Sequence, residues 1–208
     1  MIVIPGDIVK NKDENTYENN GKYYSKYLGL LEEKGEKIKI TRLFGYYIPK
    51  LNDIVIGKVI DVTPIGWLID INSQYLGYLL LKDMNIENID PNDLYTYEDY
   101  VLCQIIKITK NKIINLIAKK KEKLNDGLII DVDPMKIPRI IGKNSSMINM
   151  LKELLKVEII VGQNGRIYIN GEETNVLRTV NAIKFIEENS YKKGLTEKVK
   201  EMIEKNKI

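Results

Sequence analysis

The sequence predicts a multidomain protein of β and α/β structure, with a small N-terminal β domain over residues 1–52, a five-stranded barrel over 53–123 and a C-terminal αβ domain over 124–208. Three observations predict this division. The first segment reads as short strands between turns, the middle segment has the spacing of five strands, and the last runs strand, helix, helix, strand, strand, helix. With 208 residues, 44% of them apolar and 29% charged, the chain is long enough for two or three small domains.

Composition excludes several classes of chemistry. The chain contains no histidine, so Ser-His-Asp catalysis and His-ligated metal sites are not available. Cys103 is the only cysteine, which rules out an intrachain disulfide and a cysteine metal cluster. We therefore expect no catalytic residue, no metal and no cofactor. Because the formal net charge is only +3, any affinity for nucleic acid must come from local basic patches.

The sequence gives no sign of a membrane protein. No basic and apolar leader opens it, and the longest apolar run, Tyr75 to Leu81, is far shorter than the roughly 20 residues that cross a bilayer. A single cysteine fits a reducing compartment. We expect a cytoplasmic protein with no membrane partner.

The N-terminal segment predicts a thin β unit. Lys37 to Thr41 alternates charged or polar residues with isoleucine, which places Ile38 and Ile40 on the buried face of a strand. A unit with so little apolar mass usually needs a partner surface. Tyrosines such as Tyr46 and Tyr47 are typical of interfaces, although they could equally pack within the unit itself.

The middle segment predicts a five-stranded OB barrel. Gly57 interrupts a strand at a point where a small barrel coils sharply, and the Gly66-Trp67 and Gly77-Tyr78 pairs follow at intervals that suit the next strands. Lys110 to Lys112 form a short basic loop between the last two strands. This arrangement resembles the OB-fold RNA-binding domain first seen in ribosomal protein S-one.

Such barrels bind single strands by stacking bases on exposed aromatic rings while cations follow the phosphates. The candidate rings are Trp67, Tyr75 and Tyr78. The alternative for each ring is that it fills the barrel or packs beneath a loop. The candidate cations are Lys58, Lys107, Lys110 and Lys112.

The C-terminal segment resembles a KH domain, whose GXXG loop clamps a single-stranded backbone. Its loop would be Gly142-Lys143-Asn144-Ser145, with Arg139 nearby, and Ser145 stands where the pattern has its second glycine. Glycines let backbone amides approach a phosphate, and the following helix directs its positive end toward it. We expect Arg139, Gly142, Lys143 and Asn144 to contact RNA.

A second glycine pair occurs in the run from Gly162 to Gly165, which we interpret as a hairpin turn rather than a phosphate loop. Its Asn164-Gly165 dipeptide predicts a two-residue primed turn.

The whole chain resembles the RNA-binding cap subunit of the archaeal exosome, the ribosomal RNA processing protein four family. The resemblance is carried by the runs IPGDIV, GYYIPKLNDIVIGKVIDVTPIGWLIDINSQYLGYL, IPRIIGKNSSMINMLKE and VGQNGRIYING. It implies a non-catalytic subunit whose N-terminal domain docks on a hexameric ring of RNase PH-like subunits, with Tyr46 and Tyr47 facing that ring. It also implies that three caps, copies of this chain or of a related cap subunit, feed single-stranded, A-rich RNA into the ring for degradation or tailing.

Two other functions compete with this interpretation. A magnesium-dependent nuclease or nucleotidyl transferase could use clustered carboxylates such as Asp61 and Asp70, although their spacing does not demand a shared metal. A standalone RNA-binding accessory protein of translation or RNA processing could use the same two modules.

Overall fold

The computed structural model describes residues 1–84, 89–120, 122–192 and 194–205. The chain divides into two compact units, Met1–Gly45 and Tyr46–Ile208. The first consists of strands, and the second contains a closed five-stranded barrel followed by an αβ domain, which confirms the predicted fold class. The predicted domain boundaries at residues 52 and 123 stay predictions; Tyr46 and Tyr47 fall with the second unit.

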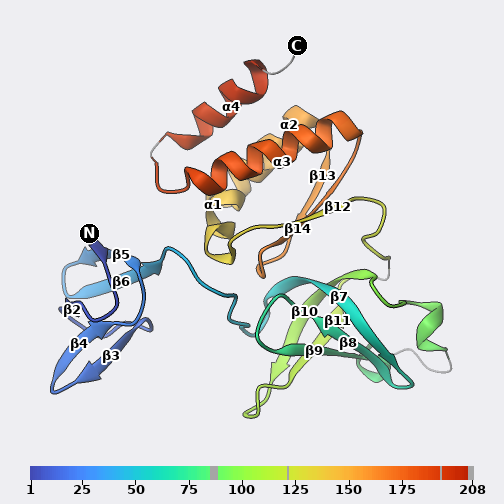
Figure 1. Ribbon diagram of the computed structural model, residues 1–208, viewed down its shortest axis with the longest axis horizontal. Coiled ribbons are helices and arrows are strands. Elements are labelled where there is room, and N and C mark those ends of the chain that lie inside the picture. The colour runs from blue at the N-terminus through green and yellow to red at the C-terminus, as the bar shows by residue number, and fades with distance from the viewer. Residues whose placement is uncertain (85–88, 121, 193, 206–208) are drawn as a thin grey trace. The chain divides into compact units, whose positions relative to one another are not determined.

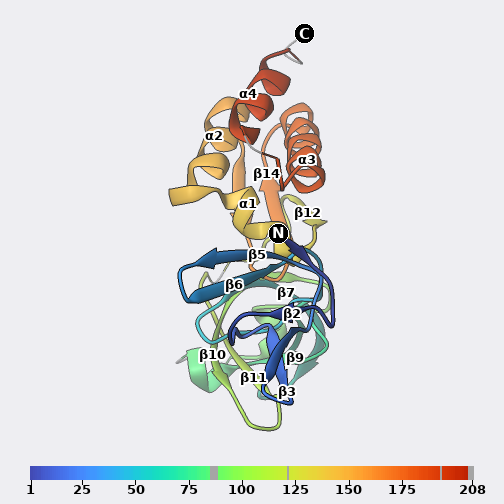
Figure 2. The same cartoon turned by 90° about the vertical axis from the view of Figure 1, so that its left-hand side faces the viewer.

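The N-terminal unit consists of two three-stranded antiparallel sheets, ordered β1-β5-β6 and β2-β4-β3. Figure 2 shows β5 and β6 side by side as a long hairpin. The strands are β1 (Ile2–Val3), β2 (Ile8–Val9), β3 (Thr16–Asn19), β4 (Lys22–Ser25), β5 (Gly29–Lys34) and β6 (Lys37–Arg42).

The core of this unit is as thin as its sequence predicts. Ile38 and Ile40 of β6 are buried with Val3, Val9 and Leu31, which confirms the predicted alternation. Large apolar side chains remain on the surface of this unit. They are Met1, Ile2, Ile4, Ile8, Tyr17, Leu28, Leu30 and Phe44.

The barrel closes in the strand order β10-β11-β9-β8-β7 (Figure 1). Short 3-10 helices η1 and η2 lie between its third and fourth strands. The elements are β7 (Ile54–Thr63), β8 (Gly66–Asp70), β9 (Leu76–Leu80), η1 (Leu81–Met84), η2 (Pro91–Asp93), β10 (Tyr100–Ile108) and β11 (Ile114–Ala118).

The barrel encloses Trp67, which we considered as an exposed stacking ring. Trp67 is 1% exposed, and its indole N–H donates a 2.8 Å hydrogen bond to the Tyr95 carbonyl. Its ring meets the Tyr95 ring edge to face, with 5.1 Å between centroids. The stacking prediction is wrong because Trp67 and Ile69 occupy the inward positions of β8, so the alternative of a barrel-filling residue is confirmed.

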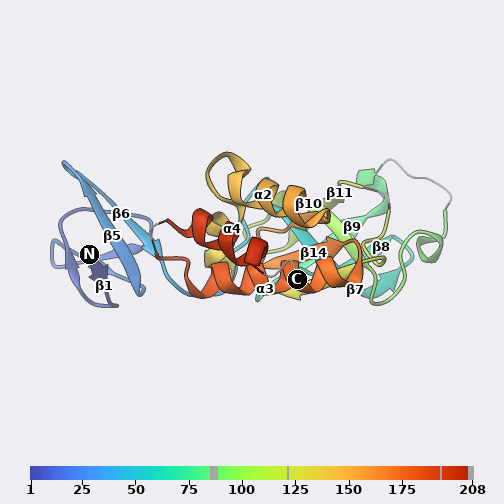
Figure 3. The same cartoon turned by 90° about the horizontal axis from the view of Figure 1, so that it is seen from above.

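The αβ domain is a three-stranded antiparallel sheet, ordered β12-β14-β13, covered on one face by helices (Figure 3). The last helix, α4, packs on α3 through Leu195, Val199 and Ile203. None of the described helices is long and apolar enough to span a membrane. The elements are β12 (Leu128–Asp131), η3 (Pro134–Lys136), α1 (Ile137–Ile141), η4 (Lys143–Ser145), α2 (Ser146–Leu155), β13 (Glu158–Val161), β14 (Arg166–Asn170), α3 (Glu173–Glu188) and α4 (Leu195–Lys205).

We predict that Trp67→Ala lowers the free energy of unfolding by about 3–5 kcal/mol, because it leaves a cavity in the barrel and an unpaired Tyr95 carbonyl. Urea denaturation of the full chain measures this change. Tyr78→Ala, on the outer face of the next strand, is the matched control and should stay within about 0.5 kcal/mol. An unchanged unfolding midpoint for Trp67→Ala would contradict the assignment of this ring to the core.

Candidate nucleic-acid interface

One row of side chains crosses the outside of the barrel. Tyr78 of β9 is 41% exposed and lies in register with Leu68 of β8 on one side and Asn115 of β11 on the other. Asn115 in turn pairs with Lys107 of β10. Since neighbouring strands are about 4.8 Å apart, Lys107 lies about 10 Å from Tyr78 along this row.

The basic hairpin loop lies at the end of the same strands. Lys110 and Lys112 are exposed there, and the Thr109 N–H closes the loop by donating to the Ile113 carbonyl at 2.9 Å. The Lys112 ammonium lies 5.9 Å from the centroid of the half-buried Tyr75 ring, within cation–π range.

We refer to the following five residues of the outer strands and the basic loop as the barrel face: Tyr75, Tyr78, Lys107, Lys110 and Lys112. In OB barrels the second and third strands, with the loops joining strands one to two and four to five, bind oligonucleotides. Here those elements are β8, β9 and the β7–β8 and β10–β11 loops. The predicted aromatic and basic residues of the barrel face belong to these elements or adjoin them.

Lys58, also predicted to bind RNA, is engaged elsewhere. Its ammonium forms a 2.9 Å ion pair with Glu98, and this hydrogen bond raises the pKa of Lys58. On β7 it pairs with Asp70 and Tyr100 rather than with the barrel face. A phosphate at this point would have to compete with the Glu98 carboxylate.

The two tyrosines predicted to face a ring of partner subunits differ in their exposure to solvent. Tyr46 is 88% exposed. Tyr47 is 5% exposed, packs in the barrel core and donates a 2.6 Å hydrogen bond to Asp53. Burial raises the pKa of Tyr47, and the Asp53 carboxylate raises it further. The prediction for Tyr47 is therefore wrong, because its ring and hydroxyl are both enclosed within the chain.

The loop between α1 and α2, Gly142 to Ser145, has three residues with positive φ. Gly142, Asn144 and Ser145 adopt φ values of 77°, 51° and 61°, in the left-handed region. A Cβ on Gly142 would lie 2.8 Å from the Met147 nitrogen, so only glycine fits there. Ser145 holds the left-handed conformation without a glycine. Lys143 and Asn144 are exposed, so the loop, which we call the KH loop, is open to a ligand.

Arg139 has a structural contact as well as its predicted position near the KH loop. Its guanidinium donates a 2.8 Å hydrogen bond to the Lys192 carbonyl, beyond the end of α3. Its Nε is buried without a hydrogen-bond partner among the described residues. This side chain therefore helps to hold the C-terminal segment against α1.

The hairpin turn from Gly162 to Gly165 joins the αβ domain to the barrel. Asn164 is 0% exposed, and its amide forms three hydrogen bonds to the barrel backbone: from the Ile56 N–H at 3.2 Å, to the Ile56 carbonyl at 2.8 Å and to the Ile71 carbonyl at 3.0 Å. The hairpin interpretation is confirmed, but the primed turn is not. Gly165 has φ 87° while Asn164 is not left-handed, because the turn directs the Asn164 side chain into the barrel.

Arg166 extends the same contact. Its buried guanidinium donates to the Asp70 carbonyl at 2.8 Å and forms an ion pair with the Asp70 carboxylate. The barrel in turn donates a hydrogen bond to the hairpin, from the Asn72 side-chain amide to the Asn164 carbonyl at 2.9 Å. We call this set the joint: Ile54, Ile56, Asp70, Ile71 and Asn72 of the barrel with Gln163, Asn164 and Arg166 of the hairpin.

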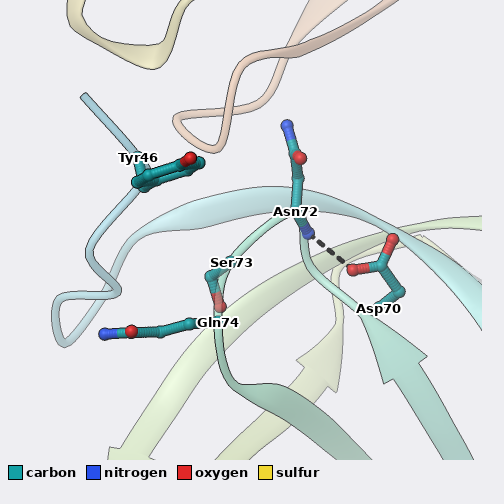
Figure 4. Close-up of a pocket in the computed structure, with 5 residues that line it drawn as sticks. All are labelled: Tyr46, Asp70, Asn72, Ser73 and Gln74. Carbon is teal, nitrogen blue, oxygen red and sulfur yellow. Dashed lines mark hydrogen bonds between the residues drawn. The ribbon is translucent and has the colours of Figure 1, made fainter. Parts of the chain in front are cut away.

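A pocket opens beside the joint (Figure 4). It has a volume of about 360 Å³ and is lined by Tyr46, Asp70, Asn72, Ser73 and Gln74. The sequence analysis did not anticipate the contacts of Asn72, Asn164 and Arg166, because nothing in the local pattern marks an amide or a guanidinium for a contact about a hundred positions away in the chain.

The described residues contain no cluster of three carboxylate or thiol side chains that could hold a metal ion. Asp70, one of the two carboxylates of the nuclease alternative, is occupied by Arg166 and by the Asn72 backbone N–H. Cys103 is buried in the barrel, and burial raises the pKa of its thiol to about 12.

Comparison with known proteins identifies two domains. A family model described as "RRP4, S1 domain" matches residues 46–92, and one described as "KH domain" matches residues 127–175. The first match includes the first three strands of the barrel, β7, β8 and β9, and the second covers the αβ domain as far as the start of α3.

Curated relatives match along the whole chain. The exosome complex component Rrp4 of Picrophilus torridus is 39% identical over 100% of this chain and 94% of its own length, and that of Sulfurisphaera tokodaii is 38% identical over 97% and 87%. A crystal structure described as a candidate exosome complex RNA-binding protein superposes with a TM-score of 0.70 at 31% identity, covering 77% of this chain and 97% of its own.

We predict that Asn164→Ala loosens the joint, because it leaves the buried Ile56 N–H and Ile71 carbonyl without their partner, at about 1–3 kcal/mol for each unsatisfied group. Urea denaturation should show reduced stability, and hydrogen exchange should show faster exchange of the Ile56 amide. Asn149→Ala, an exposed asparagine on α2, is the control. Wild-type exchange at Ile56 in the Asn164 variant would refute the role of this side chain.

Proposed function

Since the chain belongs to the Rrp4 family of exosome complex components, we propose that it is a non-catalytic subunit that binds single-stranded RNA for the exosome. One observation carries the proposal: the second unit presents the barrel face and the KH loop, two surfaces suited to single strands, in one compact body. The family relationship extends over the full length of the chain, so it covers the N-terminal unit as well.

The barrel face supplies stacking and charge. A base on Tyr78 gains about 1–3 kcal/mol from stacking without regard to sequence, and Lys107, Lys110 and Lys112 lie where the adjoining phosphates would follow. Neither contact is strong by itself. Sequence-tolerant binding of this kind suits a subunit that passes RNA along rather than selecting one site.

The KH loop supplies a second contact of a different kind. Its residues Asn144 and Ser145 are left-handed, and the N-terminal end of α2 adds a partial positive charge beside them. Lys143 and Asn144 are the exposed side chains that would border a bound backbone. Two weak sites held in one body combine their affinities, because the second binding event is intramolecular.

We further propose that the N-terminal unit docks on a hexameric ring of RNase PH-like subunits, with three caps around its entrance, in the cytoplasm. The exposed apolar side chains of this unit support the proposal, because two of them, Ile2 and Leu30, are cross-strand partners that form a continuous apolar surface. A-rich RNA would then enter the ring for shortening or tailing, and this chain supplies no catalytic group.

We predict that the contributions of stacking and of charge to RNA binding at the barrel face can be distinguished by their dependence on salt concentration. Tyr78→Ala should weaken binding of oligoadenylate about 5- to 150-fold with an unchanged slope of log affinity against log salt. A triple change of Lys107, Lys110 and Lys112 to Ala should flatten the slope by about 0.7 for each lost phosphate contact. Fluorescence anisotropy at several salt concentrations measures both. Equal slopes for the two variants would contradict this division.

We predict that Ile2→Glu prevents co-purification with the ring subunits while RNA binding by the free chain is unchanged, because a buried charge opposes an apolar interface. Lys37→Glu, an exposed change in the same unit, is the control. A wild-type chain that binds RNA but never attaches to the ring would favour a standalone RNA-binding protein.

A further inference from the structure

The pocket beside the joint has a rigid wall. Asp70 is held by Arg166 through both its backbone carbonyl and its carboxylate, and it accepts a 3.0 Å hydrogen bond from the Asn72 backbone N–H. The Asn72 side chain is fixed by its bond to the Asn164 carbonyl. Because Asn164 and Arg166 are themselves buried, this side of the pocket is ordered before any ligand arrives.

The other side of the pocket consists of exposed side chains that do not contribute to the packing of the fold. Tyr46 is the most exposed large aromatic of the described chain, and Figure 4 shows its ring and the Gln74 side chain at the pocket. Neither the Tyr46 hydroxyl nor the Gln74 amide has a hydrogen-bond partner among the described residues. An exposed ring offers a stacking face, and an amide offers one donor and one acceptor edge.

The charge of the pocket favours a neutral ligand. None of its five lining residues is a lysine or an arginine, so it has no cation to hold a phosphate. Its one carboxylate, Asp70, is neutralised by Arg166. A volume of about 360 Å³ lies within the range of about 300–1,000 Å³ that is usual for small-ligand sites.

The pocket adjoins the basic hairpin loop of the barrel. Gln74 precedes Tyr75, whose ring packs against the edge of the barrel core and lies 5.9 Å from the Lys112 ammonium. A nucleotide bound at the pocket would therefore have a cation near its neighbouring phosphate.

We propose that this pocket receives one unpaired base of the bound RNA, stacked on Tyr46 with its edge toward the amides of Gln74 and Asn72. The proposal rests on the proposed function, since it extends the path of the RNA from the barrel face to the joint. Tyr46 then contacts RNA rather than a partner subunit.

The test measures binding of labelled A, C, G and U homo-oligoribonucleotides to the full chain by fluorescence anisotropy. Tyr46→Ala should weaken binding of all four about 5- to 150-fold with an unchanged salt slope, whereas Tyr46→Phe should stay within about twofold because it keeps the ring. Tyr191→Ala, an exposed tyrosine of the C-terminal segment, is the matched control and should bind like the wild type.

Gln74→Ala tests the edge of the base. It should change the order of affinity among the four oligonucleotides, because removing an amide affects each base edge differently while stacking remains. Thermal unfolding should be unchanged in the Tyr46 and Gln74 variants, since both side chains are exposed.

Two results would overturn the inference. In one, Tyr46→Ala binds RNA as the wild type does while the barrel-face variants lose affinity. In the other, Tyr46→Ala keeps its RNA affinity and loses attachment to the ring subunits, which makes Tyr46 a protein contact. Failure of the proposed function looks different, because the wild-type chain itself would then bind none of the oligonucleotides.

Discussion

The second unit depends on one buried polar contact, the insertion of Asn164 into the barrel. A buried amide is unfavourable unless its donors and acceptor are satisfied, and here the barrel backbone satisfies them at Ile56 and Ile71. The geometry leaves no room for variation in the turn. A Cβ on Gly162 would lie 2.9 Å from the Ile56 nitrogen, and Gly165 is left-handed. Hydrogen bonds are directional, so this contact fixes an orientation that apolar packing alone would leave free to slide.

A fixed orientation changes how weak contacts combine. Two RNA-binding modules on a flexible tether would have to lose their relative freedom each time they bound one strand. In this chain that loss occurs once, on folding, because Arg166 and Asn164 already hold the hairpin against β7 and β8. Under the proposed function, the barrel face and the KH loop would therefore meet one RNA with a constant spacing. The geometry therefore favours RNA long enough to reach both surfaces, although each surface tolerates many sequences.

The sequence predicts the elements of this structure better than its contacts. Alternation places Ile38 and Ile40 inside correctly, but β8 and β9 are apolar at nearly every position, so the sequence alone does not show that Trp67 faces inward and Tyr78 outward. The burial of Tyr47 is harder to predict from the sequence, because its hydroxyl bonds to Asp53 in an irregular segment without periodic hydrophobic residues. The contacts of the joint are the hardest to predict from the sequence. Its partners are about a hundred residues apart, and a Gln-Asn turn looks the same in sequence whether it faces solvent or a neighbouring domain.

The KH loop keeps a left-handed backbone at Ser145, where the GXXG pattern has its second glycine. The left-handed conformation costs a non-glycine residue about 1–2 kcal/mol, and the loop places Asn144 and Ser145 there in succession. Asparagine tolerates this region well, and serine is small, so the penalty stays near the lower end of that range. Folding alone gives no reason to accept it, since a relaxed loop could connect α1 to α2 as well. Strain that persists at an exposed loop beside a helix N-terminus is typical of a binding site. Ser145 keeps the left-handed backbone of this position, and its N–H donates to the Gly142 carbonyl at 3.3 Å; a phosphate bound here would meet its Cβ where the GXXG pattern has glycine. Under the proposed function, this Cβ would make the KH loop the weaker of the two RNA contacts and the barrel face the stronger.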